Sequence, residues 1–186
     1  MKIGKTLVMA VVLTLWWAWG YSADQTSAVR YKDNGDGTVT DCKTGLVWLK
    51  NTNSMESIGG AKPDSYGRLS WKDAAKWLAG LRSGLCGLKD GSKAGDWRLP
   101  TKAEVEAMVA DAKSRGYENP PLTNAAGTAQ WTKNGDAFDN VSQVLYWTST
   151  EDPNEPDMVA VLVTSGDFTY CDKGGDYNVW PVRSRR

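Results

Sequence analysis

The sequence predicts a single α+β domain in which two helices pack on a mainly antiparallel sheet. Two segments in the middle of the chain combine helical periodicity with helix start signals, and strand-like runs separated by turn residues lie on both sides of them. Helices and strands that are grouped along a chain, rather than alternating, are typical of this class. The 186 residues suffice for one domain with a substantial core.

The first 23 residues have the pattern of an export signal. Two lysines precede an apolar run of thirteen residues, 7–19, and small residues follow it. The run is shorter than the roughly 20 residues that span a bilayer. We therefore expect cleavage after Gly20 or Ala23, with an uncleaved anchor as the alternative. Residues 24–186 would then be exported to the periplasm, the cell surface or the medium, without a membrane attachment.

Composition excludes several classes of function. Without residues 1–23 the chain has 20 basic and 22 acidic residues, and this small negative charge argues against nucleic acid as a partner. The chain has no histidine, which excludes Ser-His-Asp and Cys-His catalysis and histidine-based zinc sites. No pair of carboxylates stands out by its spacing, so we expect a protein that is not an enzyme and needs no cofactor.

Residues 29–50 are predicted to form consecutive antiparallel strands. The run Asp33–Gly37 supplies residues that tolerate positive φ in a tight turn. A calcium-loop interpretation of this run fails, because Lys32 and Lys43 fall at the first and last ligand positions of the EF-hand frame. Residues 51–69 are polar and glycine-rich and are predicted to form a long surface loop.

Two helices follow from their start signals. Ser70 with Asp73 begins the first, and Thr101 with Glu104 has the capping-box spacing for the second, over residues 102–115. The apolar face of the first helix consists of Trp71, Ala74, Ala75, Leu78 and Leu81, with Trp77 beside it, and that of the second of Val105, Met108, Val109 and Ala112. These faces have the spacing of a core-facing stripe.

The last third of the chain is strand-like. The predicted strands are residues 144–150, 158–164, 167–171 and 178–183. Ser165-Gly166 is typical of a hairpin turn between the second and third of them. We expect the first and last strands of the chain to be neighbours in the sheet. Residues 117–140 have little periodicity and are predicted to form a long loop.

Three cysteines, Cys42, Cys86 and Cys171, lie outside the signal. An oxidising compartment favours one disulfide and one unpaired thiol, and all three pairings stay open. The chain has no Cys-x-x-Cys pair, so a thioredoxin-like redox role lacks its motif.

Several motifs, taken in order, resemble one protein family. They are Asp33–Asp41, Thr44–Trp48, Trp71 with Ala74, Gly95–Pro100, Tyr146–Thr150 and Val179–Arg183. In this order, over residues 29–183, they resemble the Lcl C-terminal domain family of exported bacterial domains. The resemblance implies a C-type-lectin-like fold and a non-catalytic binding or adhesion role, with a surface polysaccharide, a glycosaminoglycan-like glycan or a protein as partner. It also implies a homotrimer. The alternative is a structural or assembly component of the envelope that binds proteins.

The chain departs from the family pattern at two points. Many members have a cysteine in the loop after Trp48 as the partner of the one at Cys86, whereas residues 51–55 contain none here. The resemblance therefore leaves Cys86 free or repartnered and a Cys42–Cys171 bond equally open. The low content of basic residues also argues against binding of sulfated chains, which are held by clustered lysine and arginine.

Four residues are candidates for ligand contact. Trp131 stands alone in a polar loop, whereas the other tryptophans of residues 24–186 lie in apolar runs and are expected in the core. Asp152, Glu155 and Asp157 flank a proline, and Glu155-Pro156-Asp157 is similar to the tripeptide with which calcium-dependent lectins hold calcium and sugar hydroxyls. The favoured alternative for this acidic run is a solvated connection between strands. Arg98 and Arg183 are expected to form structural pairs with carboxylates or carbonyls.

Overall fold

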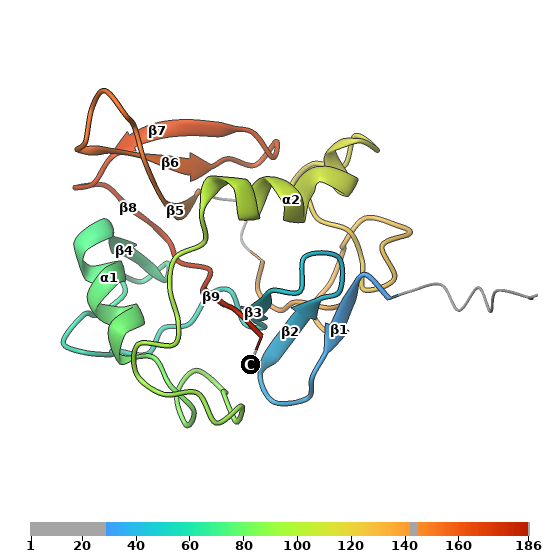
Figure 1. Ribbon diagram of the computed structural model, residues 1–186, viewed down its shortest axis with the longest axis horizontal. Helices are drawn as coiled ribbons and strands as arrows, with labels where there is room; N and C mark the ends of the chain where they lie inside the picture. Colours follow the sequence, from blue (N-terminus) through green and yellow to red (C-terminus); the bar gives the residue numbers. More distant parts are fainter. Residues whose placement is uncertain (1–28, 142–144, 186) are drawn as a thin grey trace, which may run out of the picture.

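The computed structural model describes residues 29–141 and 145–185 (Figure 1). The predicted export signal, residues 1–23, lies outside the described residues. Within them the chain forms one α+β domain with two helices, as predicted, and it has nine strands. No helix in the described ranges has the length and apolar character needed to cross a membrane.

The strands form two sheets rather than one. The first sheet is antiparallel and has the order β1 (Tyr31–Asp33), β2 (Thr38–Asp41), β3 (Val47–Leu49) and β9 (Val182–Arg183). The second has the order β4 (Arg68–Ser70), β8 (Asp176–Asn178), β5 (Tyr146–Glu151), β6 (Met158–Leu162) and β7 (Phe168–Asp172). All pairs of the second sheet are antiparallel except β5 with β8.

Three further expectations about the strands are wrong. The predicted strand over residues 178–183 is divided, because β8 ends at Asn178 in the second sheet and β9 belongs to the first. The first and last strands are not neighbours, because β9 pairs with β3 and places the fully buried Val182 opposite Trp48, so that β1 and β9 lie at opposite edges of the first sheet. The predicted loop over residues 51–69 ends in β4, which pairs with β8. Only Leu69 of the three β4 residues is buried. A single apolar residue cannot show the alternation by which a strand is recognised in a sequence.

Both helices begin where their capping residues predict. Helix α1 (Trp71–Gly80) follows Ser70, whose hydroxyl accepts a hydrogen bond from the Asp73 N–H at 3.2 Å. Helix α2 (Lys102–Lys113) begins with the predicted capping box, in which the side chains of Thr101 and Glu104 each accept the other's backbone N–H. The face predicted for α2 is buried. That of α1 is shifted, since Trp77 is buried and Ala75 is exposed.

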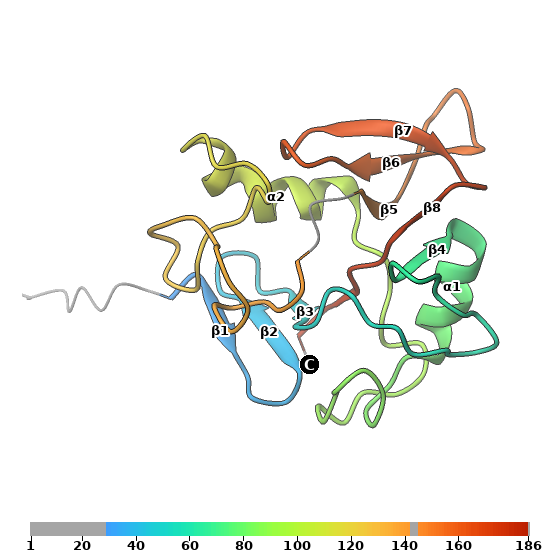
Figure 2. The same ribbon diagram turned by 180° about the vertical axis from the view of Figure 1, so that it is seen from behind.

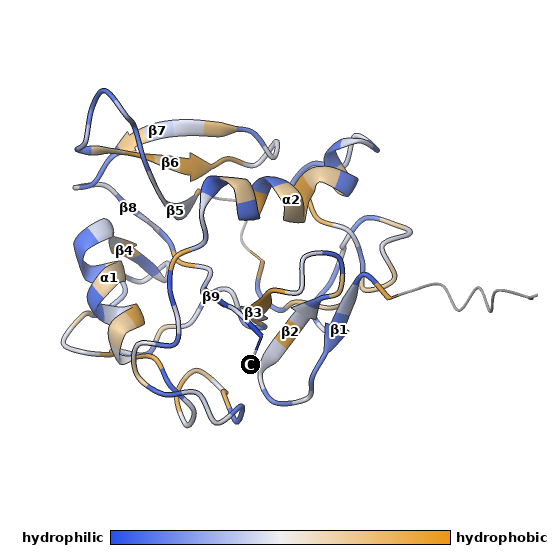
Figure 3. Ribbon diagram, in the orientation of Figure 1, coloured by the Kyte–Doolittle hydropathy of each residue, from blue (hydrophilic) through white to orange (hydrophobic). Residues whose placement is uncertain are grey.

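The core lies on both faces of the second sheet. One cluster packs α1 against Trp147, Val159 and Val161, and the other packs α2 and the first sheet against Tyr146 and Leu162. Strand β6 lies between the two and is almost wholly buried, which Figure 3 shows as a continuous hydrophobic strand. The tryptophans predicted for the core are buried, apart from the half-buried Trp71.

The segment between α2 and β5 returns to the first sheet. It lies beside β1 in both Figure 1 and Figure 2, and the Tyr31 N–H donates to the Ala125 carbonyl at 2.9 Å. Leu122, Ala137 and Phe138 of this segment are buried in the second cluster. A stretch with little periodicity is thus fixed by single apolar anchors.

Candidate functional site

A cleft of about 690 Å³ lies at one end of the first sheet. Three stretches distant in sequence form its walls: the β1–β2 turn, the segment that follows β3, and the loop after α1. Asp139 completes the lining. Binding residues are often carried by loops that a rigid scaffold positions, and the cleft has this construction.

The β1–β2 turn forms as predicted and brings Asp33 to the cleft. The Asp33 carboxylate accepts the Gly35 N–H at 2.9 Å, and both Gly35 and Gly37 have positive φ. A Cβ on Gly37 would lie 2.5 Å from the Gly87 carbonyl oxygen, so only glycine lets the turn approach the opposite wall.

This close approach yields a stability prediction. We expect Gly37→Ala to lower the free energy of unfolding by at least about 2 kcal/mol. Alanine is strained at the φ of +86°, and its Cβ would collide with the backbone of Gly87, which cannot move aside as the end of a flexible side chain could. Urea unfolding followed by tryptophan fluorescence measures the change. Gly35→Ala is the matched control, since its φ is also positive but nothing lies within 4 Å of its Cβ position. Equal losses for the two variants would contradict the role of the Gly87 contact.

Lys50 joins two carboxylates inside the cleft. Its Nζ lies 2.7 Å from Asp33 Oδ2 and 3.8 Å from Asp139 Oδ2. Burial alone would raise the pKa of Asp33, but the hydrogen bonds from Lys50 and the Gly35 N–H, together with the charge of Lys50, lower it. The hydrogen bond to Asp33 in turn raises the pKa of Lys50. Both groups therefore stay charged over a wide range around neutral pH.

Amide side chains extend this polar network. The backbone of Asn51 forms an isolated parallel β-bridge with that of Asp139, and the side-chain Oδ1 of Asn51 accepts from Asn140 Nδ2 at 3.0 Å. The Asp139 N–H donates to the Lys50 carbonyl, which holds the segment after β3 against the loop before β5. The cleft thus presents carboxylate, amide and ammonium groups in fixed positions.

Cys86 forms part of the opposite wall. Its side chain is 6% exposed, and Sγ lies 3.0 Å from the hydroxyl oxygen of Ser54. Its N–H donates to Glu56 Oε1 at 2.8 Å. Burial raises the pKa of the Cys86 thiol to about 11, so the thiol is protonated at neutral pH and is a poor nucleophile.

The predicted disulfide is absent from the structure, where all three cysteines are free. They lie in three separate places: Cys42 is exposed just after β2, Cys86 is buried in the cleft wall, and Cys171 is half-buried in β7 beside Tyr177. The prediction of a disulfide was based on the expected oxidising compartment and on the number of cysteines. Neither indicates how far apart the cysteines lie in the folded chain.

Trp131 anchors its loop. Its Nε1 donates to the Phe138 carbonyl at 3.1 Å, and its half-buried ring packs against the second core cluster. It does not line the cleft. The predicted structural pairs are confirmed: Arg98 lies 2.6 Å from Glu104, and Arg183 lies 3.0 Å from Asp90.

The acidic run forms the connection between β5 and β6. The Asp152 carboxylate accepts the N–H groups of Asn154 and Glu155 at 2.8 and 3.3 Å and so shapes this turn. Glu155 and Asp157 are exposed. No group of three or more acidic, cysteine or histidine side chains in the described ranges is placed to hold a metal ion.

Sequence reasoning missed most of the cleft. Asp33 belonged to a turn that the sequence marked, but Lys50, Asn51, Glu56 and Asp139 are ordinary loop residues in stretches far apart. No spacing rule connects them, because the two sheets and the segment before β5 bring them together.

The two sheets, two helices and loop-lined cleft define an α+β domain whose polar depression is built on a rigid scaffold. The chain belongs to the Lcl C-terminal domain family, whose model matches residues 37–183. This match confirms the resemblance drawn from the motifs. No curated protein matches the chain.

Proposed function

We propose that the protein is an exported, non-catalytic binding module that holds a neutral surface polysaccharide in the cleft. The observation that supports this most is the network of Asp33, Lys50, Asn51 and Asp139, which offers fixed donors and acceptors at the surface. Neighbouring sugar hydroxyls both donate and accept hydrogen bonds, and such mixed groups satisfy them. The C-type-lectin-like fold implied by the resemblance is compatible with this arrangement and belongs to the same proposal.

The charge of the cleft selects among glycans. Its lining has three carboxylates, on Asp33, Glu56 and Asp139, against one ammonium group on Lys50. A sulfated or carboxylated chain would be repelled by this excess of negative charge. The proposal therefore favours a neutral glycan over the glycosaminoglycan-like ligand that the resemblance implies.

A glycan array tests the ligand class. We expect the protein to bind one or more neutral glycans, with or without calcium, and to bind sulfated chains more weakly. Preference for sulfated chains would contradict the assignment to this cleft, and loss of binding in chelator would point to a cation that the proposal does not require. If the protein binds no glycan on the array, the result would favour the alternative, an envelope assembly component that binds proteins.

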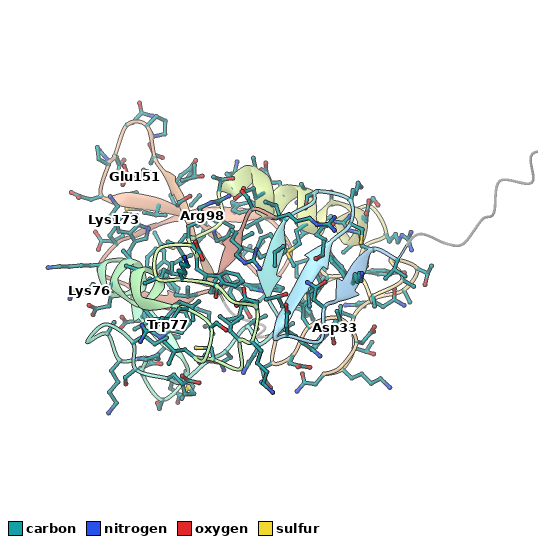
Figure 4. The ribbon with its side chains drawn as sticks, turned by 60° about the horizontal axis from the view of Figure 1, so that its bottom comes forward. Asp33, Lys76, Trp77, Arg98, Glu151 and Lys173 are labelled. Carbon is teal, nitrogen blue, oxygen red and sulfur yellow. The ribbon has the colours of Figure 1, made fainter. Side chains whose placement is uncertain are left out.

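Lys50 is the residue to change first. We expect Lys50→Met to weaken binding of the array-selected glycan about 10- to 100-fold, because it removes a charged donor and the partner that orients two carboxylates. Isothermal titration calorimetry measures the affinity. Lys76→Met is the matched control, since Lys76 is an exposed lysine of α1 paired with Asp73. Figure 4 shows Lys76 on the opposite side of the view from Asp33. Equal affinities of the two variants would place the ligand elsewhere.

The pKa shifts predict a flat pH profile for this binding. The lowered pKa of Asp33 keeps its carboxylate charged until the pH falls below the ordinary aspartate range, and the raised pKa of Lys50 keeps the ammonium charged above the ordinary lysine pKa. We expect the affinity to be constant from about pH 5 to about pH 9 and to fall as Asp33 is protonated in stronger acid. Calorimetry at several pH values checks this, and a midpoint near neutral pH would contradict the assignment of these groups to the site.

A further inference from the structure

Strand β7 is an open edge of the second sheet. It pairs with β6 along its whole length and has no described strand on its other side. Figure 1 shows β7 as the outermost strand of the molecule, away from the first sheet. Proteins commonly protect such an edge, because its unpaired backbone groups can bind another strand.

The ladder with β6 fixes which backbone groups are open. The hydrogen bonds from Val163 N to Asp167 O and from Lys173 N to Asp157 O flank the β6–β7 pair. Since hydrogen-bonded pairs alternate in an antiparallel ladder, the odd-numbered residues of β7 bond to β6. The backbone N–H and C=O groups of Phe168, Tyr170 and Asp172 therefore point to the open edge, where the Asp172 carbonyl also accepts the Gly175 N–H.

The side chains of two of these residues line a groove. Phe168 and Tyr170 share a depression of about 560 Å³ with Lys102, Glu106 and other residues of α2. Tyr170 is 38% exposed although it is a large aromatic residue. Cys171, which points to the other face, packs against the first core cluster. The open edge and the groove thus form one continuous surface between β7 and α2.

We propose that β7 pairs antiparallel with β7 of a second copy of this chain, around a two-fold axis at Tyr170. In this register Tyr170 faces Tyr170 of the second copy, and Phe168 faces Asp172 of the second copy. The N–H groups of all three residues and the carbonyls of Phe168 and Tyr170 are open on this edge, and the Asp172 carbonyl, which accepts the Gly175 N–H, has a second lone pair, so the strand is self-complementary in hydrogen bonding. Two-fold pairing of identical surfaces is the commonest form of protein association.

Charge complementarity supports β7 of a second copy as the partner strand. The Nζ of Lys102 lies 5.4 Å from the centroid of the Phe168 ring. Asp172 of the second copy, opposite Phe168, would extend its side chain on the same face and so come beside Lys102. The two Tyr170 rings would meet directly at the axis, and the pairing would cover this exposed aromatic side chain.

The proposed pairing leaves the ligand clefts open. No residue of β7 or α2 lines the cleft, so a dimer would present two of them. Two linked sites bind a repeating polysaccharide with higher avidity than either site alone. The inference about β7 stands on backbone geometry and does not depend on the identity of the ligand.

Sedimentation equilibrium of the purified protein tests the pairing. We expect a reversible dimer for the wild type and dimerisation weakened about tenfold or more for Tyr170→Lys, because it places two like charges opposite each other at the axis. Tyr66→Lys is the matched control, since Tyr66 is 69% exposed and lies outside the groove. An equimolar mixture of Tyr170→Lys and Tyr170→Glu should restore dimers, which loss of folding could not do.

Four outcomes would overturn the proposal. They are a wild type that stays monomeric up to the highest soluble concentration, a trimer, a Tyr170→Lys variant that dimerises as the wild type does, and a mixture of charge variants that stays monomeric. A wild type that stays monomeric but still binds glycan would overturn this inference and leave the proposed function intact. A wild type that dimerises but binds no glycan would do the reverse.

Discussion

Replacing Arg30 with methionine is expected to lower the free energy of unfolding by about 3–5 kcal/mol, the cost of leaving a buried charge without its partner. Arg30 Nη2 lies 2.9 Å from Asp41 Oδ2, and the two side chains are 6% and 0% exposed. Its Nη1 lies 2.6 Å from Asp111 of α2. The guanidinium therefore joins the start of the first sheet to the second helix.

The substitution acts mainly through what it leaves behind. Asp41 would keep the N–H of Lys43 at 2.9 Å but lose its only cation among the ion pairs of the described residues. Asp111 is less affected, because its lowered pKa is due first to the hydrogen bond from Lys43. Most of the expected loss thus belongs to Asp41.

Urea unfolding at neutral pH measures this effect, with Arg98→Met as the matched control. Arg98 pairs with Glu104 at 2.6 Å, but its side chain is 43% exposed, so we expect a change of at most about 1 kcal/mol. The double variant Arg30→Met with Asp41→Leu should recover much of the lost stability, because no buried charge remains unpaired. Similar losses for Arg30→Met and Arg98→Met would show that burial does not control the cost.

Features with local causes could be predicted from the sequence. The helix starts follow from Ser70 and Thr101, each of which satisfies backbone groups within three residues of itself. The β1–β2 turn follows from glycines that adopt positive φ. Such signals act over a few residues, so a single sequence contains all of the information they need.

Features with distant causes could not be predicted in this way. Strand β4 exists because β8, more than a hundred residues later, pairs with it. The parallel pairing of β5 with β8 and the split into two sheets likewise depend on which strands the two helices cover. The contact of Trp131 with Phe138 is likewise not evident from the sequence, since Phe138 is buried only after the loop has folded onto the first sheet.

The candidate site combines both kinds of cause. The turn that carries Asp33 was evident, but the residues facing it were not, because a polar loop residue in a binding site resembles any other polar loop residue. The acidic run drew attention by composition, yet Asp152 uses its carboxylate to shape the turn. Composition reveals which groups are present, whereas a site requires that they converge.

The second large effect is expected from a disulfide that the wild type lacks. Ser54 and Cys86 face each other with Oγ and Sγ 3.0 Å apart. We therefore expect Ser54→Cys to form a disulfide with Cys86, with only a small approach of the two walls to reach a sulfur–sulfur distance of about 2.05 Å. In this chain the hydrogen bond from Ser54 to Cys86 is the link between the two walls at this point.

A bond between residues 54 and 86 would close a loop of roughly 32 residues, for which the chain-entropy relation gives about 3.7 kcal/mol of stabilisation. Thermal unfolding with and without reductant measures it, and the double variant Ser54→Cys with Cys86→Ala is the control that cannot close the loop. Titration of free thiols under denaturing conditions should find two in the oxidised variant, against the three of the wild type. Four free thiols after oxidation would show that the two walls do not approach as the structure places them. Because Ser54 and Cys86 both line the cleft, the bond would fix its width, and glycan affinity before and after reduction would then report whether the ligand needs the walls to move.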